Sequence, residues 1–176
     1  MLTLPNLLTL ARLVLTPFVV LAILHATYGS AIVLFFVAGI SDAVDGYLAR
    51  RLGKSTPAGA YFDPVVDKIL LSAIYIALGV VRAIPWWMVA LVFARDLLIL
   101  AMAAYGLLFT RVRRFPPSVW GKISTFLQIA AALVVMGARD GIPTPVGLAL
   151  WLMVAGTVLS GVHYVWQGLH ILRTTD

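Results

Sequence analysis

The chain contains no cysteine and no glutamate, and its 176 residues include only seven acidic side chains, all of them aspartate. The absence of cysteine excludes disulfides and thiolate metal sites, and it leaves the redox compartment undetermined. The N-terminus has neither a basic leading region nor a small-residue cleavage site, so we predict no signal peptide. Because no internal repeat, low-complexity stretch or domain boundary is visible, residues 1–176 are predicted to form a single domain.

Polar residues as a whole are scarce, since 62% of the chain is hydrophobic and the mean hydropathy is +1.02. Soluble domains average about 45–50% apolar residues. The composition therefore predicts an all-α integral membrane protein, with room for about six spans of roughly 20 residues. A formal charge of +6 could suggest nucleic acid in a soluble chain. In a membrane protein it indicates basic cytoplasmic loops and an anionic ligand, so no nucleic-acid partner is expected.

Apolar runs separated by polar connections predict six transmembrane helices after a short amphipathic N-terminal segment at residues 2–10. The predicted spans are residues 13–29, 31–48, 63–81, 85–109, 120–136 and 146–172. We expect a bend at Pro17, because proline removes a backbone donor. Residues 49–61 are predicted to be a polar connection, and residues 110–119 a basic loop.

Basic residues are unevenly distributed over the predicted connections. Those on one side of the membrane are Arg50, Arg51, Lys54, Arg111, Arg113, Arg114 and Arg173. The opposite connections hold only Arg82 and Arg139. By the positive-inside rule, this distribution places both termini in the cytoplasm.

Four of the seven aspartates lie in one very apolar stretch: Asp42, Asp45, Asp63 and Asp67. A carboxylate at the bilayer centre costs roughly 2.5–3.5 kcal/mol, so four unpaired ones would cost on the order of 10 kcal/mol. On helices, Asp42 and Asp45 share one face, and so do Asp63 and Asp67. Because a short connection makes the two helices antiparallel, their acidic faces can converge near the cytoplasmic side.

Four converging carboxylates suit two divalent cations, Mg²⁺ or Mn²⁺, about 3.5–4 Å apart. The four positive charges of the two cations would balance the four aspartate carboxylates. Gly46 and Gly59 remove side-chain bulk beside the acids, which lets a ligand approach the backbone. Arg50 and Lys68 lie close by in sequence and are left to bind an anion such as a diphosphate.

Other interpretations of these residues stay open at this point. A single aspartate in a span can be a helix cap or the partner of an arginine, and Gly46 and Gly59 can be helix-packing residues. The basic loops can be simple determinants of topology. Clustered acids can also mark the ion path of a cation transporter, although the repeats and broken helices of transporters are not found here.

Residues 42–67 spell D-x-x-D-G-x-x-A-R-x₈-G-x₃-D-x₃-D. This pattern resembles the signature of the CDP-alcohol phosphotransferases. Its specified positions are Asp42, Asp45, Gly46, Ala49, Arg50, Gly59, Asp63 and Asp67. The segment Pro5–Arg12 also resembles the amphipathic start of bacterial members, which suggests a bacterial-type inner membrane with the active site facing the cytoplasm.

The resemblance implies that a CDP-linked lipid, usually CDP-diacylglycerol, places its diphosphate on a two-metal centre. An acceptor hydroxyl then attacks phosphorus and CMP leaves. Asp42, Asp45 and Asp63 would be the main metal ligands, and Asp67 would contact a metal and act as the base. Residues Asp45, Gly46, Ala49, Arg50 and Gly59 would line the CDP-lipid site. A route through a phosphatidyl-aspartate is the less favoured alternative, because a carboxylate held by metals is a poor nucleophile.

The second half of the chain bears on the acceptor. Phosphatidylglycerophosphate synthases usually carry a second Arg two turns after the first one of span 4, and Gly-Lys-x-Lys-Thr in span 5. This chain has Ala103 and Ser124 at those places, so two cations that suit the phosphate of glycerol-3-phosphate are missing. Its Arg95-Asp96 pair resembles cardiolipin synthases of the eukaryotic type, whose acceptor is phosphatidylglycerol. We favour phosphatidylglycerol, with glycerol-3-phosphate second and an inositol phosphate third.

Arg95, Lys122 and Gln128 are the candidate acceptor-binding residues in the spans. Their plainer interpretation is an intramembrane Arg95–Asp96 pair and a snorkelling Lys122. The basic residues Arg111, Arg113 and Arg114 are further candidates for lipid headgroups. Family resemblance also suggests a homodimer that is surrounded by membrane lipids.

Overall fold

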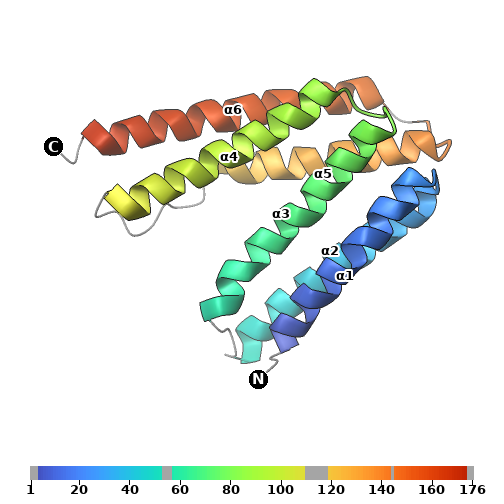
Figure 1. Cartoon of the computed structure of the whole chain (residues 1–176), viewed down its shortest axis with the longest axis horizontal. Helices are drawn as coiled ribbons and strands as arrows, with labels where there is room; N and C mark the ends of the chain where they lie inside the picture. The colour runs from blue at the N-terminus through green and yellow to red at the C-terminus, as the bar shows by residue number, and fades with distance from the viewer. Residues whose placement is uncertain (1–3, 53–56, 110–118, 144, 174–176) are drawn as a thin grey trace. The chain divides into compact units, whose positions relative to one another are not determined.

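The computed structural model consists of six helices and, over the residues that it describes, contains no strand (Figure 1). The helices are α1 (Leu4–Leu24), α2 (Tyr28–Leu52), α3 (Pro57–Val80), α4 (Trp86–Phe109), α5 (Val119–Arg139) and α6 (Val146–Arg173). The backbone is described for residues 4–52, 57–109, 119–143 and 145–173, and the side chains for 12–41, 68–102, 119–143 and 145–167. The all-helical architecture predicted from the sequence is confirmed.

Several helix boundaries differ from the prediction, and α1 ends at Leu24, before the predicted residue 29. The amphipathic segment at 2–10 is not a separate element, because α1 continues through Arg12 and Pro17 to Leu24. Arginine is a good helix former, so its charge does not interrupt the backbone. Both ends of the polar connection predicted at 49–61 are helical, because α2 continues to Leu52 and α3 begins at Pro57, and residues 53–56 lie outside the described residues. Proline is favoured at the first position of a helix, where its missing N–H has no intrahelical partner.

Two helices are long and apolar enough to cross a membrane, judged over the described residues: Val119–Arg139 and Val146–Gln167. Shorter apolar stretches occupy Arg12–Leu24, Tyr28–Ser41 and Lys68–Val80. The six membrane spans and the cytoplasmic termini therefore stay predictions.

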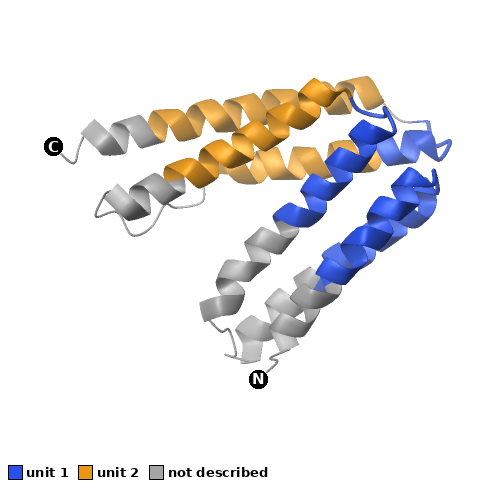
Figure 2. Cartoon of the chain, viewed as in Figure 1, with its two compact units in different colours: residues 1–84, 135–144 blue, residues 85–134, 145–176 orange. Residues whose placement is uncertain are grey.

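The chain divides into two compact units, and the boundary crosses α5 (Figure 2). Unit 1 comprises residues 1–84 and 135–144. Within it α1 contacts both α2 and α3. Its core consists of apolar side chains that are fully buried, such as Val19, Ile23, Ala31, Ile74 and Leu78. Apolar burial of this kind fixes which faces of the helices meet.

Residues at the end of α5 and just after it close unit 1 at one end. An Asp140 Oδ1 atom accepts a hydrogen bond from the Gly29 N–H at 3.1 Å, where α2 begins. A carboxylate is favourable there because the first N–H groups of a helix lack intrahelical partners. A Cβ atom at Gly29 would lie 3.0 Å from Asp140 Oδ2, so glycine leaves the room for this contact. Arg139 Nη2 also donates to the Arg82 carbonyl at 3.2 Å.

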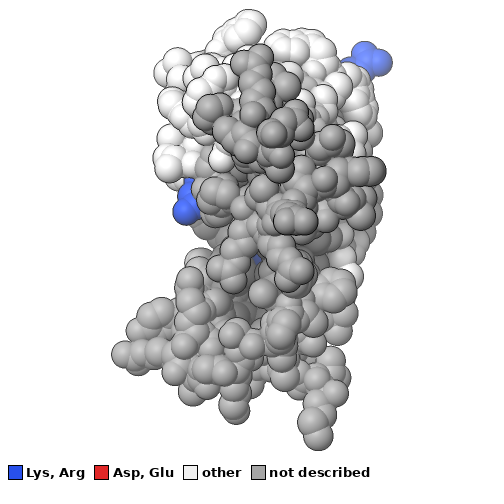
Figure 3. All heavy atoms as spheres, turned by 90° about the vertical axis from the view of Figure 1, so that its left-hand side faces the viewer, with Lys and Arg blue, Asp and Glu red and all other residues white. Residues whose placement is uncertain are grey.

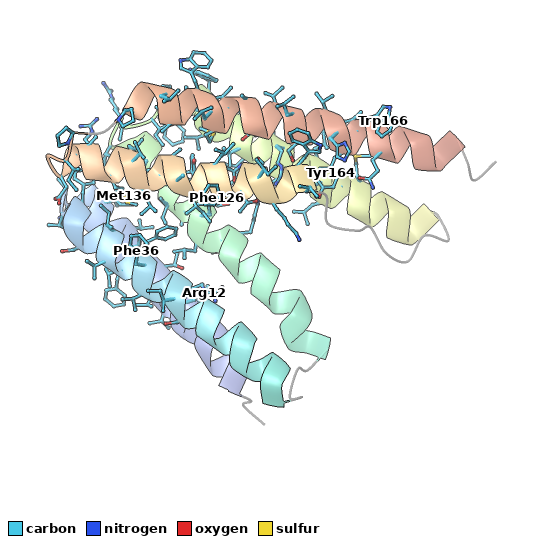
Figure 4. The ribbon with its side chains drawn as sticks, turned by 180° about the vertical axis from the view of Figure 1, so that it is seen from behind. Arg12, Phe36, Phe126, Met136, Tyr164 and Trp166 are labelled. Atoms are coloured by element: carbon cyan, nitrogen blue, oxygen red, sulfur yellow. The ribbon has the colours of Figure 1, made fainter. Side chains whose placement is uncertain are left out.

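Unit 2 comprises residues 85–134 and 145–176, with α4 packed on α6. Large apolar side chains on α5 and α6 stay exposed, among them Phe126 at 68% and Trp166 at 63% (Figure 4). A soluble domain would expose few such side chains. In the view of Figure 3 the described surface is mostly uncharged, with Lys and Arg at isolated places. This apolar exterior agrees with a membrane environment.

Candidate active site

The acidic motif is carried by two helices of unit 1. Asp42 and Asp45 belong to α2, and Asp63 and Asp67 belong to α3. The helical backbone at these positions supports the predicted spacing, which puts each pair on one helical face. The four side chains lie outside the described residues, so their convergence stays a prediction.

The remaining motif residues follow the same division. Gly46, Ala49 and Arg50 belong to α2, and Gly59 belongs to α3. Of these, Ala49, Arg50 and Gly59 were predicted to lie in the polar connection 49–61. Their surroundings, and those of Arg111, Arg113 and Arg114 in the predicted basic loop, lie outside the described residues. Among the side chains that are described, no group of three or more His, Cys, Asp or Glu could hold a metal ion.

Unit 2 contains a buried polar cluster centred on an arginine, which we call the Arg95 cluster: Arg95, Asp96, Gly121, Ser160 and Tyr164. Only 7% of Arg95 is exposed and Ser160 is fully buried. Arg95 Nη1 pairs with Asp96 Oδ1 at 3.0 Å. Its Nε and Nη2 atoms both donate to Ser160 Oγ, at 3.2 and 2.8 Å. Because a buried charge is costly unless it is paired and hydrogen-bonded, these contacts stabilise the guanidinium.

The same guanidinium links α4 to α5 as well as to α6. Nη2 of Arg95 also donates to the Gly121 carbonyl at 3.4 Å, and the Tyr164 ring lies 5.9 Å from the guanidinium carbon. A Cβ atom at Gly121 would lie 3.0 Å from Tyr164 Oη and 3.3 Å from Arg95 Nη2. Glycine at position 121 therefore leaves room for the arginine to approach the backbone this closely.

A second polar contact joins α5 to α6 through Gln128, which is fully buried. Its Nε2 atom donates to Thr157 Oγ1 at 3.3 Å and to Ser124 Oγ at 3.5 Å. The Thr157 hydroxyl in turn contacts Met153 Sδ at 3.8 Å. Hydrogen bonds of this kind hold membrane helices together, at about 1 kcal/mol each. Gln128 thus lies in a polar stripe between two apolar helices.

Lys122 differs from both residues because its side chain is exposed. It has no hydrogen-bond or ion-pair partner among the residues that the structure describes. Arg95 therefore contacts Gly121, the residue before Lys122. The arginine is buried and paired, whereas the lysine is exposed.

Thr157, Ser160 and Tyr164 of α6 were not predicted from the sequence. Their spacing of three and then four residues places them on one helical face, within a helix that is otherwise apolar. This spacing is a signal that could have identified them, because polar residues within a membrane helix usually face other helices.

The sequence model described as CDP-alcohol phosphatidyltransferase matches residues 2–162. The chain belongs to the CDP-alcohol phosphatidyltransferase family. The family membership predicted from residues 42–67 is thus confirmed. The protein is a phosphatidyltransferase that uses a CDP-alcohol and an acceptor alcohol. Members of this family generally depend on divalent cations.

Curated relatives of this phosphatidyltransferase carry two kinds of name. A Mycobacterium tuberculosis protein named "probable phosphatidylglycerophosphate synthase" is 34% identical, over 94% of this chain and 81% of the relative. The Bacillus subtilis CDP-diacylglycerol–glycerol-3-phosphate 3-phosphatidyltransferase is 31% identical over the whole of both chains. A Schizosaccharomyces pombe fusion protein named cardiolipin synthase (CMP-forming) / mitochondrial hydrolase is 36% identical over 58% of this chain and 17% of its own. The names therefore agree on the class of activity and differ on the acceptor alcohol, for which the residues of the site have to be considered.

Proposed function

We propose that this phosphatidyltransferase transfers a phosphatidyl group from CDP-diacylglycerol to phosphatidylglycerol, which yields cardiolipin and CMP. The charge balance of unit 2 carries the proposal. Among its described side chains the cations are Arg95, which is paired with Asp96, and Lys122, which is exposed. Within the predicted spans, one unpaired cation among the described side chains matches the single negative charge of a phosphodiester acceptor better than the greater charge of a phosphomonoester. Arg111, Arg113 and Arg114 belong to the predicted basic loop outside these spans and are not part of this balance.

Position 124 adds support on the acceptor side. Ser124 is fully buried and lies within hydrogen-bonding distance of Gln128. A lysine is typical of phosphatidylglycerophosphate synthases at this place, and it would need a charged partner in such a buried position. The buried serine supplies a hydroxyl in place of that cation.

On the donor side, Asp42, Asp45, Asp63 and Asp67 form a set of oxygen ligands that fits two Mg²⁺ or Mn²⁺ ions. Bound cations of this kind would withdraw charge from the phosphoryl oxygens and orient the diphosphate. Helical geometry puts each pair of acids on one face, which supports their acting together.

The chain's own residues would position the substrates and move one proton. Arg50 would grip the diphosphate, and the small residues Gly46, Ala49 and Gly59 would let the cytidine approach the helices. Asp67 would accept the proton of the acceptor hydroxyl as that oxygen attacks phosphorus. CMP would leave with the electron pair of the broken phosphorus–oxygen bond.

The acceptor would be held by Lys122, Arg95 and Gln128, with Arg111, Arg113 and Arg114 near its headgroup. Lys122 would supply the charge, and the other two side chains would supply directional N–H donors. We further propose six membrane spans with both termini and the active site on the cytoplasmic side of a bacterial-type inner membrane. A homodimer is part of the same proposal.

Glycerol-3-phosphate is the second candidate acceptor. The relatives from M. tuberculosis and B. subtilis, which cover most or all of this chain, carry names that specify phosphatidylglycerophosphate or glycerol-3-phosphate. This observation favours phosphatidylglycerophosphate synthesis in place of cardiolipin synthesis.

One assay separates the candidates. Purified protein in lipid nanodiscs would receive CDP-diacylglycerol and Mg²⁺, together with phosphatidylglycerol, glycerol-3-phosphate or an inositol phosphate in separate reactions. We expect CMP release and a cardiolipin product with phosphatidylglycerol alone. Phosphatidylglycerophosphate as the main product would establish the second candidate. Absence of CMP release with every acceptor would overturn the proposed function.

A further inference from the structure

The two edges of the Arg95 guanidinium are occupied by different partners. A guanidinium has five N–H donors in a fixed plane. The side edge, formed by Nε and Nη2, faces Ser160 Oγ at 3.2 and 2.8 Å. The two nitrogens of the end edge also have partners, since Nη1 donates to Asp96 Oδ1 at 3.0 Å and Nη2 donates to the Gly121 carbonyl at 3.4 Å. Four of the five donors are therefore used within the protein, and one N–H of Nη1 remains.

This occupancy limits what Arg95 can bind. Arginine recognises a phosphate most strongly when two parallel N–H groups on one edge contact two oxygens. Ser160 closes the side edge, and both nitrogens of the end edge already donate to Asp96 or Gly121. A single remaining N–H allows only one hydrogen bond to an acceptor phosphate.

We infer that Ser160 is a positioning residue that sets acceptor specificity, because its hydroxyl occupies the side edge of Arg95. The inference rests on the proposed acceptor role of Arg95. One N–H and a paired charge suit the singly charged phosphodiester of a lipid headgroup. A phosphomonoester carries about −1.5 to −2 at neutral pH and gains most from a two-pronged contact. Ser160 thus disfavours glycerol phosphate and leaves phosphatidylglycerol as the better acceptor.

The position of Ser160 makes this role separable from simple packing. The residue is fully buried on α6, and its side chain is a single hydroxymethyl group. Replacing Ser160 by alanine removes only the oxygen from this side chain, and with it the acceptor for Nε and Nη2 of Arg95. The adjacent Gly161 offers a matched control, since a Cβ atom there would meet nothing within 4 Å. Both substitutions leave an alanine on the same turn of the same helix, but only one frees the arginine edge.

The test compares Ser160→Ala, Ser160→Thr and Gly161→Ala with the unmodified protein. We expect Ser160→Ala to lower the dissociation constant of glycerol-3-phosphate about tenfold, which corresponds to one charge-assisted hydrogen bond. Calorimetry on nanodisc-bound protein with Mg²⁺ measures this constant without turnover. The KM for phosphatidylglycerol should stay unchanged. Ser160→Thr, which keeps the hydroxyl, and Gly161→Ala should both behave like the unmodified protein.

Two results would overturn the inference. An unchanged affinity for glycerol-3-phosphate in Ser160→Ala would show that the side edge is not available to acceptors. A parallel loss of affinity for both acceptors would show a purely structural serine. If Ser160→Ala does not fold, Ser160→Cys gives the same comparison with a weak acceptor atom of similar size. Failure of the proposed function appears separately, as absence of CMP release by the unmodified protein with phosphatidylglycerol as the acceptor.

Discussion

Arg95 and Asp96 are neighbours in sequence with opposite charges, and both are buried. Their pairing at 3.0 Å cancels most of the charge that either could present to a ligand. Lys122, by contrast, keeps a full charge that is exposed. At the residue scale, therefore, the count of cations in the sequence overstates the positive charge available to an acceptor.

This difference gives a prediction for Lys122. We expect Lys122→Gln to raise the KM of the acceptor about tenfold, since a hydrogen bond to a charged group contributes about 1.5–3 kcal/mol. The KM for CDP-diacylglycerol should stay the same. Steady-state CMP release with each substrate varied in turn measures both constants. Arg139→Gln, which removes one exposed charge at the other end of α5, is the control. A rise in both constants for Lys122→Gln would assign the lysine a general electrostatic role.

Asp67 has the clearest chemical assignment among the acids. We expect Asp67→Asn to abolish transfer while CDP-diacylglycerol binding is largely kept, because the amide cannot accept the acceptor's proton. Asp63→Asn should weaken CDP-diacylglycerol binding, because it removes a main metal ligand. CDP-diacylglycerol binding and CMP release, measured on the same preparations of each variant, test both expectations. Equal loss of binding in the two variants would make Asp67 an ordinary ligand.

At the element scale, α4, α5 and α6 are joined by polar contacts that require little side-chain bulk at their crossing points. Gly121 lets Arg95 reach a backbone carbonyl, and Gly156 lies where a Cβ atom would come 2.6 Å from Leu127 Cδ1. The hydrogen bond of Gln128 to Thr157 completes the contact between α5 and α6. Small residues and buried hydroxyls together allow this close packing.

The crossing at Gly121 can be tested by adding one methyl group. We expect Gly121→Ala to destabilise the protein by about 1 kcal/mol, at the low end for overpacking, because a Cβ atom 3.0 Å from Tyr164 Oη and 3.3 Å from Arg95 Nη2 makes both side-chain ends shift slightly. Gly147→Ala on α6 is the control, since its Cβ atom would meet nothing within 4 Å. There the substitution should leave stability unchanged or raise it. Thermal unfolding followed by circular dichroism compares the two, and equal melting temperatures would contradict the expectation.

The helices were largely predictable, and their ends were less so. α4 and α6 begin within a residue of the prediction because Pro85 and Pro145 mark the preceding turns. α2 was predicted to end too early, since its charged last turn at Arg50 and Arg51 looked like a loop although arginine favours helix. Polarity in the sequence does not separate a polar helix end from a connection.

The candidate site was predictable in its residue types only. The pattern of residues 42–67 identified the family, and Arg95 and Gln128 were singled out as polar residues in predicted spans. Their contact with Ser160 and Thr157 could not be predicted, because it depends on which faces of α4, α5 and α6 meet. That choice is made by the packing of apolar side chains far apart in sequence.

At the scale of the whole molecule, activity should depend on divalent cations. We expect EDTA to abolish CMP release and Mg²⁺ or Mn²⁺ to restore it, because four carboxylates in apolar helices need compensating positive charge. The metal-free protein should also unfold at a lower temperature, since an ion that binds only the folded state stabilises it. Full activity in the chelator would contradict the assignment of Asp42, Asp45, Asp63 and Asp67 as ligands.

The hydrogen bond between Gly29 and Asp140 joins residues that are 111 positions apart. The ribosome therefore releases α1, α2 and α3 long before the segment that completes their unit is made. Until then the N–H of Gly29 must find another acceptor, such as water. A fragment that ends at residue 84 would lack this partner permanently, so the first three helices are not expected to form a finished module when they are expressed alone.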